Sequence, residues 1–401
     1  MNASKHQNQV VIFGTGEFGK VVNHCLVRAG HSPVAFIDLN ERNIGRELHG
    51  IPIIELSSDI SGTIVLASNR NNYQHLYSLL SKYSLLNVEE CDDYLEYIDY
   101  ETLEVNWSRE RVKSEIRTHL SRSSNRKSAN KGFVVNSLDV VVTEKCSLKC
   151  KDCSNLMQYY QSPITVQEET LLQDLTDILD ALEYVTELRF IGGEPLLFKG
   201  IYSAIAEICN FKNFDELVVF TNGTIVPKDH QLEKLRDERI RFQISNYGDL
   251  SRRTDQLVSA LDEHKIRFVN DRVTTWQDCA RIEKVERTLE DTASVFANCC
   301  VNDAFTLLHG RVYGCPFGAH AENLSAIPIS KSDSFSVSDR IGQRIAEGFS
   351  KLMSLTSYAA CDYCNGRDYT VSVVEAAVQV KAPISYQRVE ISEFLACVDD
   401  A

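Results

Sequence analysis

The sequence lacks any run of about 18 apolar residues, and its polar first residues contain no apolar stretch of the signal-peptide kind. These absences predict a cytoplasmic protein with no membrane partner. An excess of basic residues is also missing: 42 Lys and Arg stand against 56 Asp and Glu, for a net charge of −14. Nucleic acid is therefore not expected as a partner. The 401 residues, 43% of them hydrophobic, predict a globular chain of two or three domains.

Cysteine, in contrast, is abundant, with 13 residues in the chain. In a reducing compartment, closely spaced cysteines indicate metal ligation or catalysis rather than disulfides. Most of them fall into two groups, one near residue 150 and one in the C-terminal third. Four of the remaining five lie in apolar or terminal contexts and are predicted to have no chemical role: Cys25, Cys91, Cys209 and Cys397.

The first hundred residues carry a nucleotide-binding type of pattern. An apolar strand at 10–13 is followed by a G-x-G-x-x-G turn, a helical stretch and a second strand that ends in an acid. Glycines in such a turn let the backbone approach a pyrophosphate, and the helix N-terminus supplies positive potential. A structural domain without a ligand is the alternative. The candidate nucleotide-binding residues are Gly14, Gly16, Gly19 and Asp38.

This N-terminal domain is expected to be Rossmann-like and to span 1–105. It is short for a redox dinucleotide fold, and it resembles the small N-terminal domains of sugar acyltransferases that bind nucleotide-sugars. The resemblance implies a nucleotide or nucleotide-sugar as its ligand.

Residues 106–135 are rich in Lys, Arg and Ser and are predicted to link this domain to the next. Val112, Ile116 and Leu120 have helical spacing, so the first half is expected to form a helix. The Ser-rich stretch 121–131 is expected to be an irregular tether.

From residue 136 onwards, short apolar runs alternate with amphipathic helical patterns. Such βα repetition predicts a parallel sheet, open or closed into a barrel, with ligands at the carboxyl ends of its strands. The candidate strands are 138–142, 187–191, 216–220, 241–244 and 266–269.

Three cysteines directly follow the first of these strands. Cys146, Cys150 and Cys153 have the spacing C-x3-C-x2-C, which is one ligand short of the four that usually hold an iron–sulfur cube. A structural zinc site would need a fourth ligand close by, and no His or Cys occurs in the next fifty residues or so. Three cysteines leave one iron open to bind a small molecule.

Polar and glycine-rich motifs lie at the ends of the next three strands. Glycines there permit close backbone approach, and polar side chains suit contacts to a ribose or a carboxylate. The candidate cofactor-binding residues are Gly192, Gly193, Glu194 and Pro195 after the second strand, Thr221 and Asn222 after the third, and Ser245 and Asn246 after the fourth.

With these motifs, residues 136–290 resemble the radical S-adenosylmethionine (SAM) superfamily. The resemblance implies a partial (βα)6 barrel and a 4Fe–4S cluster whose open iron is chelated by SAM, which is cleaved to a 5′-deoxyadenosyl radical. It also implies that the Gly-Gly-Glu-Pro motif holds the methionine ammonium and that a flavodoxin or ferredoxin supplies electrons. One departure is Asp152, because the residue before the last cysteine is commonly aromatic in this family.

A second cysteine group lies in the C-terminal third. The stretch 306–312 is predicted to be a hairpin with its turn at Gly310, which would bring Cys300 beside Cys315. Four thiolates without a histidine favour a closed iron–sulfur cluster or zinc. The predicted ligands are Cys300, Cys315, Cys361 and Cys364, with Cys299 as the alternative to Cys300.

This arrangement resembles the twitch extension of radical SAM enzymes, a shorter relative of the SPASM domain. The resemblance implies one auxiliary 4Fe–4S cluster, two clusters in all, in an extension that spans 291–401.

The leading hypothesis for function is hydrogen abstraction from a sugar-like or nucleotide-sugar substrate, ending in oxidation or epimerisation. Known twitch enzymes include an aminocyclitol dehydrogenase and a sugar epimerase. Cys279 is a candidate hydrogen-atom donor, with a small buried residue as the alternative. Two other hypotheses are a maturase of ribosomally made peptides and a non-catalytic iron–sulfur redox or sensor protein.

Overall fold

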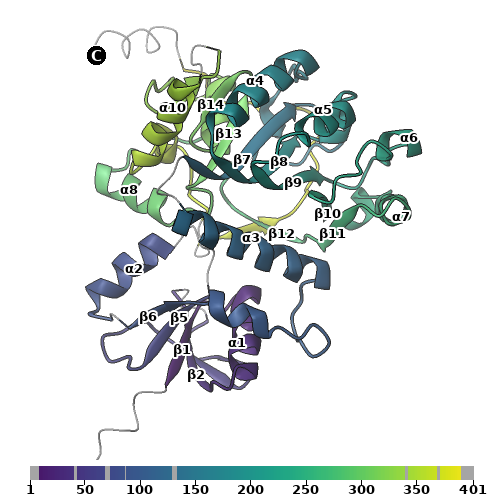
Figure 1. Ribbon diagram of the computed structural model, residues 1–401. Coiled ribbons are helices and arrows are strands. Elements are labelled where there is room, and N and C mark those ends of the chain that lie inside the picture. The colour runs from purple at the N-terminus through teal and green to yellow at the C-terminus, as the bar shows by residue number, and fades with distance from the viewer. Residues whose placement is uncertain are drawn as a thin grey trace, which may run out of the picture. The chain divides into compact units, whose positions relative to one another are not determined.

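The structure is a computed structural model (Figure 1), and it describes residues 9–39, 43–67, 73–85, 87–128, 133–338, 342–367 and 371–389. The chain divides into two compact units, 1–124 and 125–401. Cys397 lies outside the described residues. Within the described part of the chain, no helix has the length and apolar character needed to span a bilayer.

The first unit is built on a six-stranded sheet. Its elements are β1 (Val10–Phe13), α1 (Glu17–Arg28), β2 (Pro33–Ile37), β3 (Glu47–Leu48), β4 (Ile51–Ile54), β5 (Thr63–Leu66), α2 (Tyr73–Lys82), β6 (Val88–Glu90), η2 (Asp92–Tyr97) and α3 (Arg109–Ser128). The strand order is β3-β4-β2-β1-β5-β6, and only the pair of β3 with β4 is antiparallel. The five parallel strands thus follow the order 3-2-1-4-5 of doubly wound sheets.

Helix α3 is longer than predicted. It continues to Ser128, so the expectation of an irregular tether from residue 121 is wrong over 121–128. The sequence between Arg109 and Ser128 contains neither Pro nor Gly, the two residues that most readily stop a helix. The buried stripe of the helix also differs from the prediction, because Leu120 is 39% exposed whereas His119 is 6% exposed.

The second unit is built on an eight-stranded sheet. Its strands are β7 (Val134–Thr143), β8 (Tyr184–Gly192), β9 (Phe214–Thr221), β10 (Ile240–Asn246), β11 (Arg267–Arg272), β13 (Ala304–Leu308), β14 (Arg311–Tyr313) and β15 (Ser334–Ser336). The order is β11-β10-β9-β8-β7-β13-β14-β15, parallel from β11 to β13 and antiparallel from β13 to β15. The five predicted strands correspond to β7 to β11.

Helices and short 3-10 turns connect these strands. They are η3 (Met157–Tyr159), α4 (Glu168–Ala181), η4 (Pro195–Leu197), α5 (Ile201–Ile208), α6 (Asp229–Leu232), η5 (Gly248–Leu250), α7 (Thr254–Glu263), α8 (Leu289–Ala297), α9 (Pro316–Asn323), α10 (Gln343–Ser354) and η6 (Ala359–Asp362). Apolar side chains of α4, α5 and α7 pack with those of β7 to β10 in one core. Burial on both faces explains the near-continuous apolar runs of the central strands.

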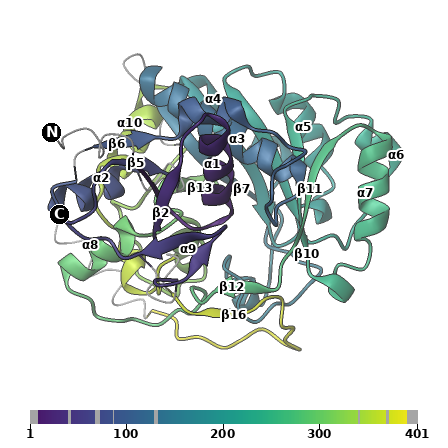
Figure 2. The same cartoon turned by 90° about the horizontal axis from the view of Figure 1, so that it is seen from below.

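The predicted partial barrel is present, and the structure adds its sixth parallel strand, for which the sequence analysis named no candidate. After β11 comes the short strand β12 (Thr275–Gln277), which pairs antiparallel with β16 (Val373–Glu375) in a separate two-stranded sheet (Figure 2). The next segment, 278–288, is irregular and offers no apolar run for a buried strand. The sixth parallel strand is β13, which pairs with β7 at the other edge, so the partial barrel and the predicted extension from residue 291 share one sheet and one compact unit.

Candidate functional site

The predicted SAM-binding motifs meet at one edge of the second sheet. Strands β7, β8, β9 and β10 are adjacent and parallel, so their carboxyl ends lie side by side. The cysteine loop follows β7, the Gly-Gly-Glu-Pro turn ends β8, and the predicted polar pairs end β9 and β10. Ligands of open α/β sheets bind at such an edge.

The Gly-Gly-Glu-Pro turn packs directly on the cysteine loop. Gly193 N donates to Thr143 O at 2.9 Å, and Glu194 N donates to Lys145 O at 2.8 Å. A Cβ atom built on Gly193 would lie 2.4 Å from Lys145 O and 2.8 Å from Cys146 Cβ. This position therefore has no space for any side chain, which explains the second glycine of the motif.

We expect Gly193→Ala to displace the cysteine loop, because the clashing atoms belong to the backbone and to a Cβ. Overpacking of this kind costs about 1–3 kcal/mol. The variant should melt at a lower temperature and retain fewer irons than the wild type after reconstitution. Gly16→Ala is the control, since a Cβ there has no neighbour within 4 Å. Equal iron retention by both variants would contradict the packing argument.

The thiols of the cysteine loop receive several N–H donors. Leu148 N lies 3.4 Å and Asn222 Nδ2 lies 3.7 Å from Cys146 Sγ, and Gln379 Nε2 lies 3.3 Å from Cys150 Sγ. Burial raises the pKa of Cys150 to about 11, so its proton must leave when a metal binds. N–H donors stabilise thiolate sulfur and tune cluster potentials. A sulfur-only ligand set with such donors fits an iron–sulfur cluster.

Glu194 is fully buried, and its carboxylate has internal donors. It accepts hydrogen bonds from Thr221 Oγ1 at 2.8 Å, Asn222 N at 2.8 Å and Leu196 N at 3.2 Å. Burial raises the pKa of Glu194 to about 7, although these three donors act in the opposite direction. The side chain thus ties the end of β8 to the end of β9. Its predicted pairing with the methionine ammonium stays a prediction.

Asn222 connects the end of β9 to the cysteine loop. Its amide nitrogen lies 3.0 Å from Ser147 Oγ, and Ser147 Oγ lies 2.6 Å from Thr224 Oγ1. Ser245 and Asn246, at the end of β10, make local contacts: Ser251 Oγ donates to Ser245 O, and Asn246 Oδ1 accepts from Gly248 N at 2.9 Å. The structure therefore links the β9 pair directly to the cysteines, whereas the β10 pair contacts the turn that follows it and Asn270 of β11.

A C-terminal segment, 377–380, lies along the cysteine loop. Lys151 N donates to Val378 O and Val380 N donates to Lys149 O, both at 2.7 Å, while Lys149 N donates to Gln379 Oε1 at 2.8 Å. Ala377 also packs in a small cluster with Leu148 and Cys150. The sequence analysis missed this segment, because no local motif marks a pairing between stretches so distant in the chain.

Two aromatic residues also join this small cluster. Tyr247 follows β10 and Trp276 lies on β12, and their rings meet edge to face with centroids 5.5 Å apart. They pack against Leu148 and Cys150 and so add apolar surface beside the cysteine loop. Neither residue was assigned a role from the sequence.

The predicted nucleotide-binding residues meet at the carboxyl end of β1. Gly14 N donates to Ile37 O at 3.0 Å, and a Cβ on Gly19 would lie 2.1 Å from Gly14 O, so Gly19 is needed for close packing of α1. Gly16 faces open space. Asp38 accepts hydrogen bonds from Thr15 Oγ1 and from Asn43 Nδ2, the latter at 2.7 Å. The loop therefore has the predicted form, with its acid held by the loop itself.

The second cysteine group gathers around one cavity beside α8 and α9. Cys299, Cys315, Cys361 and Cys364 line this cavity. Gly318 N donates to Cys315 Sγ at 3.2 Å at the start of α9, and Gly366 N donates to Cys364 Sγ at 3.3 Å. Four half-buried cysteines, two of them with N–H donors to sulfur, fit a closed iron–sulfur cluster.

The cavity favours Cys299, the alternative ligand, over Cys300. Burial first, and then neighbouring thiols including Cys299, raise the pKa values of Cys315, Cys361 and Cys364. Among the described residues, Cys300 does not line the cavity, and its amide donates to Arg367 O at 3.0 Å. Cys299 continues the face of α8 that carries Val295 and Phe296, which also line the cavity. The predicted hairpin over 306–312 is present as β13 and β14.

Cys279 lies between the two cysteine groups. It is 4% exposed, and its carbonyl oxygen is 3.6 Å from Cys364 Sγ. After burial, Cys279 is the main neighbour that raises the pKa of Cys364, to about 12, and it also contributes at Cys153. Arg367 spans the same region, since Nη2 donates to Ser154 O at 3.3 Å and its carbonyl accepts from Cys300. No local sequence pattern marks Arg367 as part of this region.

Glu322 on α9 is a buried carboxyl group near this cavity, and it makes folding depend on pH. Burial raises its pKa from 4.5 to about 7 against the hydrogen bond from Ser330 N. Because the folded-state pKa lies above the unfolded value, full stability holds below about pH 4.5 and is lost as the pH rises through 7.

We expect Glu322→Gln to be more stable than the wild type at pH 8, by up to about 3 kcal/mol, and equally stable near pH 4.5. Calorimetric melting of the metal-free full-length chain at both pH values measures this difference. Glu347→Gln, an exposed control on α10, should show no such difference between the two pH values. If the two proteins differed in stability by the same amount at both pH values, ionisation of Glu322 would not be the cause.

A comparison with known protein families gives a match to the part of the chain that contains the first cysteine group. Residues 140–246, which contain the cysteine loop and the ends of β8 to β10, match the family described as the radical SAM superfamily. The chain therefore contains a radical SAM domain, the enzyme class that its cysteine spacing predicted.

Among curated proteins, GTP 3′,8-cyclase of Alkaliphilus metalliredigens is 26% identical over 142 residues, which are 32% of this chain and 43% of that protein. GTP 3′,8-cyclase of Helicobacter pylori is 31% identical over 97 residues, 24% of this chain and 30% of that protein. The chain thus spans less than half the length of these relatives. Among solved structures, BtrN in complex with AdoMet and 2-DOIA aligns with a TM-score of 0.39 and 18% identity, over 58% of this chain and 93% of BtrN.

Proposed function

We propose that this protein is a radical SAM enzyme that abstracts a hydrogen atom from a small sugar-like or nucleotide-sugar substrate. The observation that carries the proposal is the packing of the Gly-Gly-Glu-Pro turn directly on the loop of Cys146, Cys150 and Cys153. Three thiolates on a 4Fe–4S cube leave one iron for SAM. When bound, the cluster and SAM would supply a 5′-deoxyadenosyl radical.

The residues of this chain prepare the site in three ways. The amides of Leu148 and Gln379 stabilise thiolate sulfur. Glu194 fixes the backbone of Asn222 where a ribose or carboxylate of the cofactor would lie. Tyr247 and Trp276 cover the loop with apolar surface, which keeps water from a reactive radical.

A second 4Fe–4S cluster is proposed at Cys299, Cys315, Cys361 and Cys364, which line one cavity. In an oxidation, the substrate radical would lose a proton and pass its second electron to this cluster. In an epimerisation, the Cys279 thiol would return a hydrogen atom to the opposite face. The position of Cys279 beside Cys364 supports either route.

The full-length protein, reconstituted without oxygen and reduced with dithionite in place of the expected flavodoxin or ferredoxin, tests the proposal. SAM should be cleaved to 5′-deoxyadenosine, and a nucleotide-linked sugar or free aminocyclitol should accelerate this. The panel includes GTP, because the matched relatives are named for it, and short peptides. Acceleration by peptides alone would overturn the substrate class, and no 5′-deoxyadenosine under any condition would overturn the reaction.

The first unit is proposed to bind a nucleotide or nucleotide-sugar at Gly14–Gly19. Gly16 faces open space, so Gly16→Ala should leave the melting temperature unchanged and weaken nucleotide-sugar binding, because a methyl group blocks close approach of a pyrophosphate. Binding to the full-length wild type and variant can be compared by calorimetry. Equal affinity of both proteins would place the nucleotide elsewhere.

A further inference from the structure

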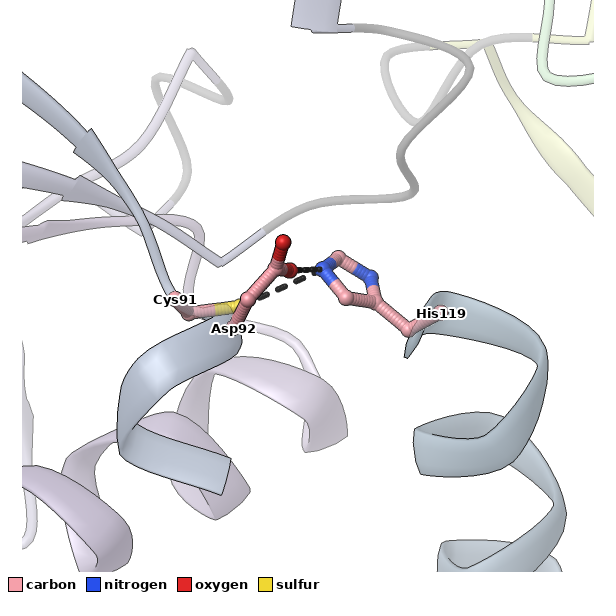
Figure 3. A group of neighbouring side chains, drawn as sticks. All are labelled: Cys91, Asp92 and His119. Carbon is pink, nitrogen blue, oxygen red and sulfur yellow. Dashed lines mark hydrogen bonds and ion pairs between the residues drawn. The ribbon is translucent and has the colours of Figure 1, made fainter. Parts of the chain in front are cut away.

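Three potential metal ligands meet in the first unit, away from both cysteine groups of the second. Cys91 directly follows β6, Asp92 begins η2, and His119 lies on α3 (Figure 3). His119 shares the buried stripe of α3 with Val112 and Ile116, which turns its ring towards the carboxyl end of β6. The sequence analysis gave Cys91 no chemical role, because its partner is far away in the chain.

The three side chains converge on one point. Cys91 Sγ lies 3.4 Å and Asp92 Oδ1 lies 3.1 Å from His119 Nε2, and all three ligand atoms are within 4.8 Å of one another. Ligands of a tetrahedral zinc ion, with bonds of about 2.0–2.3 Å, are separated by about 3.3–3.5 Å. The observed separations are close to this spacing.

The same geometry argues against a catalytic triad. In a triad, the nucleophile and the acid contact opposite nitrogens of the imidazole ring, so that a proton can pass across it. Here both Cys91 and Asp92 contact Nε2 (Figure 3). Three donors around one shared position can hold an ion there, but they cannot relay a proton through the ring.

We propose that Cys91, Asp92 and His119 bind a divalent transition metal ion, with zinc as the best fit to one sulfur, one nitrogen and one oxygen ligand. A thiolate, a carboxylate and a neutral imidazole around a dipositive ion form a neutral unit. Neutrality matters because Cys91 is fully buried and the side chains of Asp92 and His119 are 10% and 5% exposed. Water or an anionic ligand atom takes the fourth position.

The site has a structural consequence for the first unit. The ion joins the end of the edge strand β6 to α3, and the ring of His119 packs on Phe18 of α1 with ring centroids 5.0 Å apart. Phe18 belongs to the Gly14–Gly19 loop segment, so the ion fixes a helix that contacts this loop. Loss of the ion is therefore expected to loosen the first unit without removing iron from the second.

Zinc binding to the anaerobically iron-loaded full-length protein tests the proposal. Zinc should remain at about one ion per chain after gel filtration, and absorption spectroscopy at the zinc edge should show one sulfur among about four ligands. Cys91→Ser and His119→Gln should lose this zinc while keeping the iron content of the wild type. The sulfur count identifies the site, because zinc in either cysteine group would have three or four sulfur neighbours.

Matched controls separate ligation from misfolding. Cys25→Ser removes another fully buried cysteine of the same unit, and His24→Gln removes another histidine; both should keep their zinc. Asp92→Asn preserves shape and should weaken zinc binding with a circular dichroism spectrum like that of the wild type. The proposal is overturned if the wild type retains no zinc, if His119→Gln retains it, or if the bound zinc has three or more sulfur neighbours. A plain ion pair of protonated His119 with Asp92 would produce the first of these results.

Discussion

Cys150→Ala is expected to abolish the formation of 5′-deoxyadenosine from SAM and to lower the iron content from about eight to about four per chain. Cys150 supplies one of three sulfurs in the loop after β7, and its thiol receives a hydrogen bond from Gln379. With two sulfurs left, the cube loses one of its three protein ligands. Product analysis by mass spectrometry and iron quantification on the same sample measure both effects.

Cys209→Ala is the matched control for this experiment. Cys209 is another cysteine of the second unit, half-buried where Cys150 is buried, and it directly follows α5 rather than lying in either cysteine group. This variant should keep about eight irons and full SAM cleavage. If Cys150→Ala still cleaved SAM reductively, the assignment of the first cluster to this loop would be wrong.

The parts of the site that the sequence could predict are marked by local patterns. The apolar run of β7 and the cysteines directly after it are neighbours in the chain, and so are the run of β8 and its Gly-Gly-Glu-Pro turn. Parallel strands place such ends side by side, so adjacency in the sheet follows from the βα repeat. The radical SAM assignment depended on these features alone, and the family match over 140–246 agrees with it.

The features that the sequence could not predict depend on long-range pairing. Gln379 reaches Cys150 only because the segment 377–380 pairs with the cysteine loop. The sixth parallel strand joins β7 rather than β11, because a buried edge was available there and 278–288 has no apolar run to form a strand. Neither of these two pairings can be recognised in the local sequence pattern.

Helix α3 illustrates a finer ambiguity. Counting from Val112, helical spacing permits either position 119 or position 120 on the buried face, and the apolar Leu120 is the natural choice from residue type. The structure buries His119 instead, because Cys91 and Asp92 provide polar partners for its ring. Burying a histidine that has such partners costs little free energy of folding, whereas burying one without partners would be unfavourable.

Substitution of Cys299, compared with substitution of Cys300, is the second change for which we expect a large effect on iron content. Cys299→Ala should lose about four irons, those of the auxiliary cluster, while Cys300→Ala should keep about eight, because only Cys299 lines the cavity with Cys315, Cys361 and Cys364. The two substitutions are one residue apart and remove the same atom, so each is the control of the other. Mössbauer spectra of the iron-57 protein would show the loss directly.

The two variants should also differ in their activity on the substrate. Cys299→Ala leaves the loop of Cys146 untouched, so reductive cleavage of SAM should persist in it. Conversion of substrate should fall by at least about tenfold, because the cluster that would accept the second electron of the oxidation is missing. Cys300→Ala should convert substrate like the wild type. The reverse outcome, iron loss in Cys300→Ala alone, would mean that binding of a cluster turns the end of α8 so that Cys300, held in this structure by Arg367 O, replaces Cys299 as the ligand.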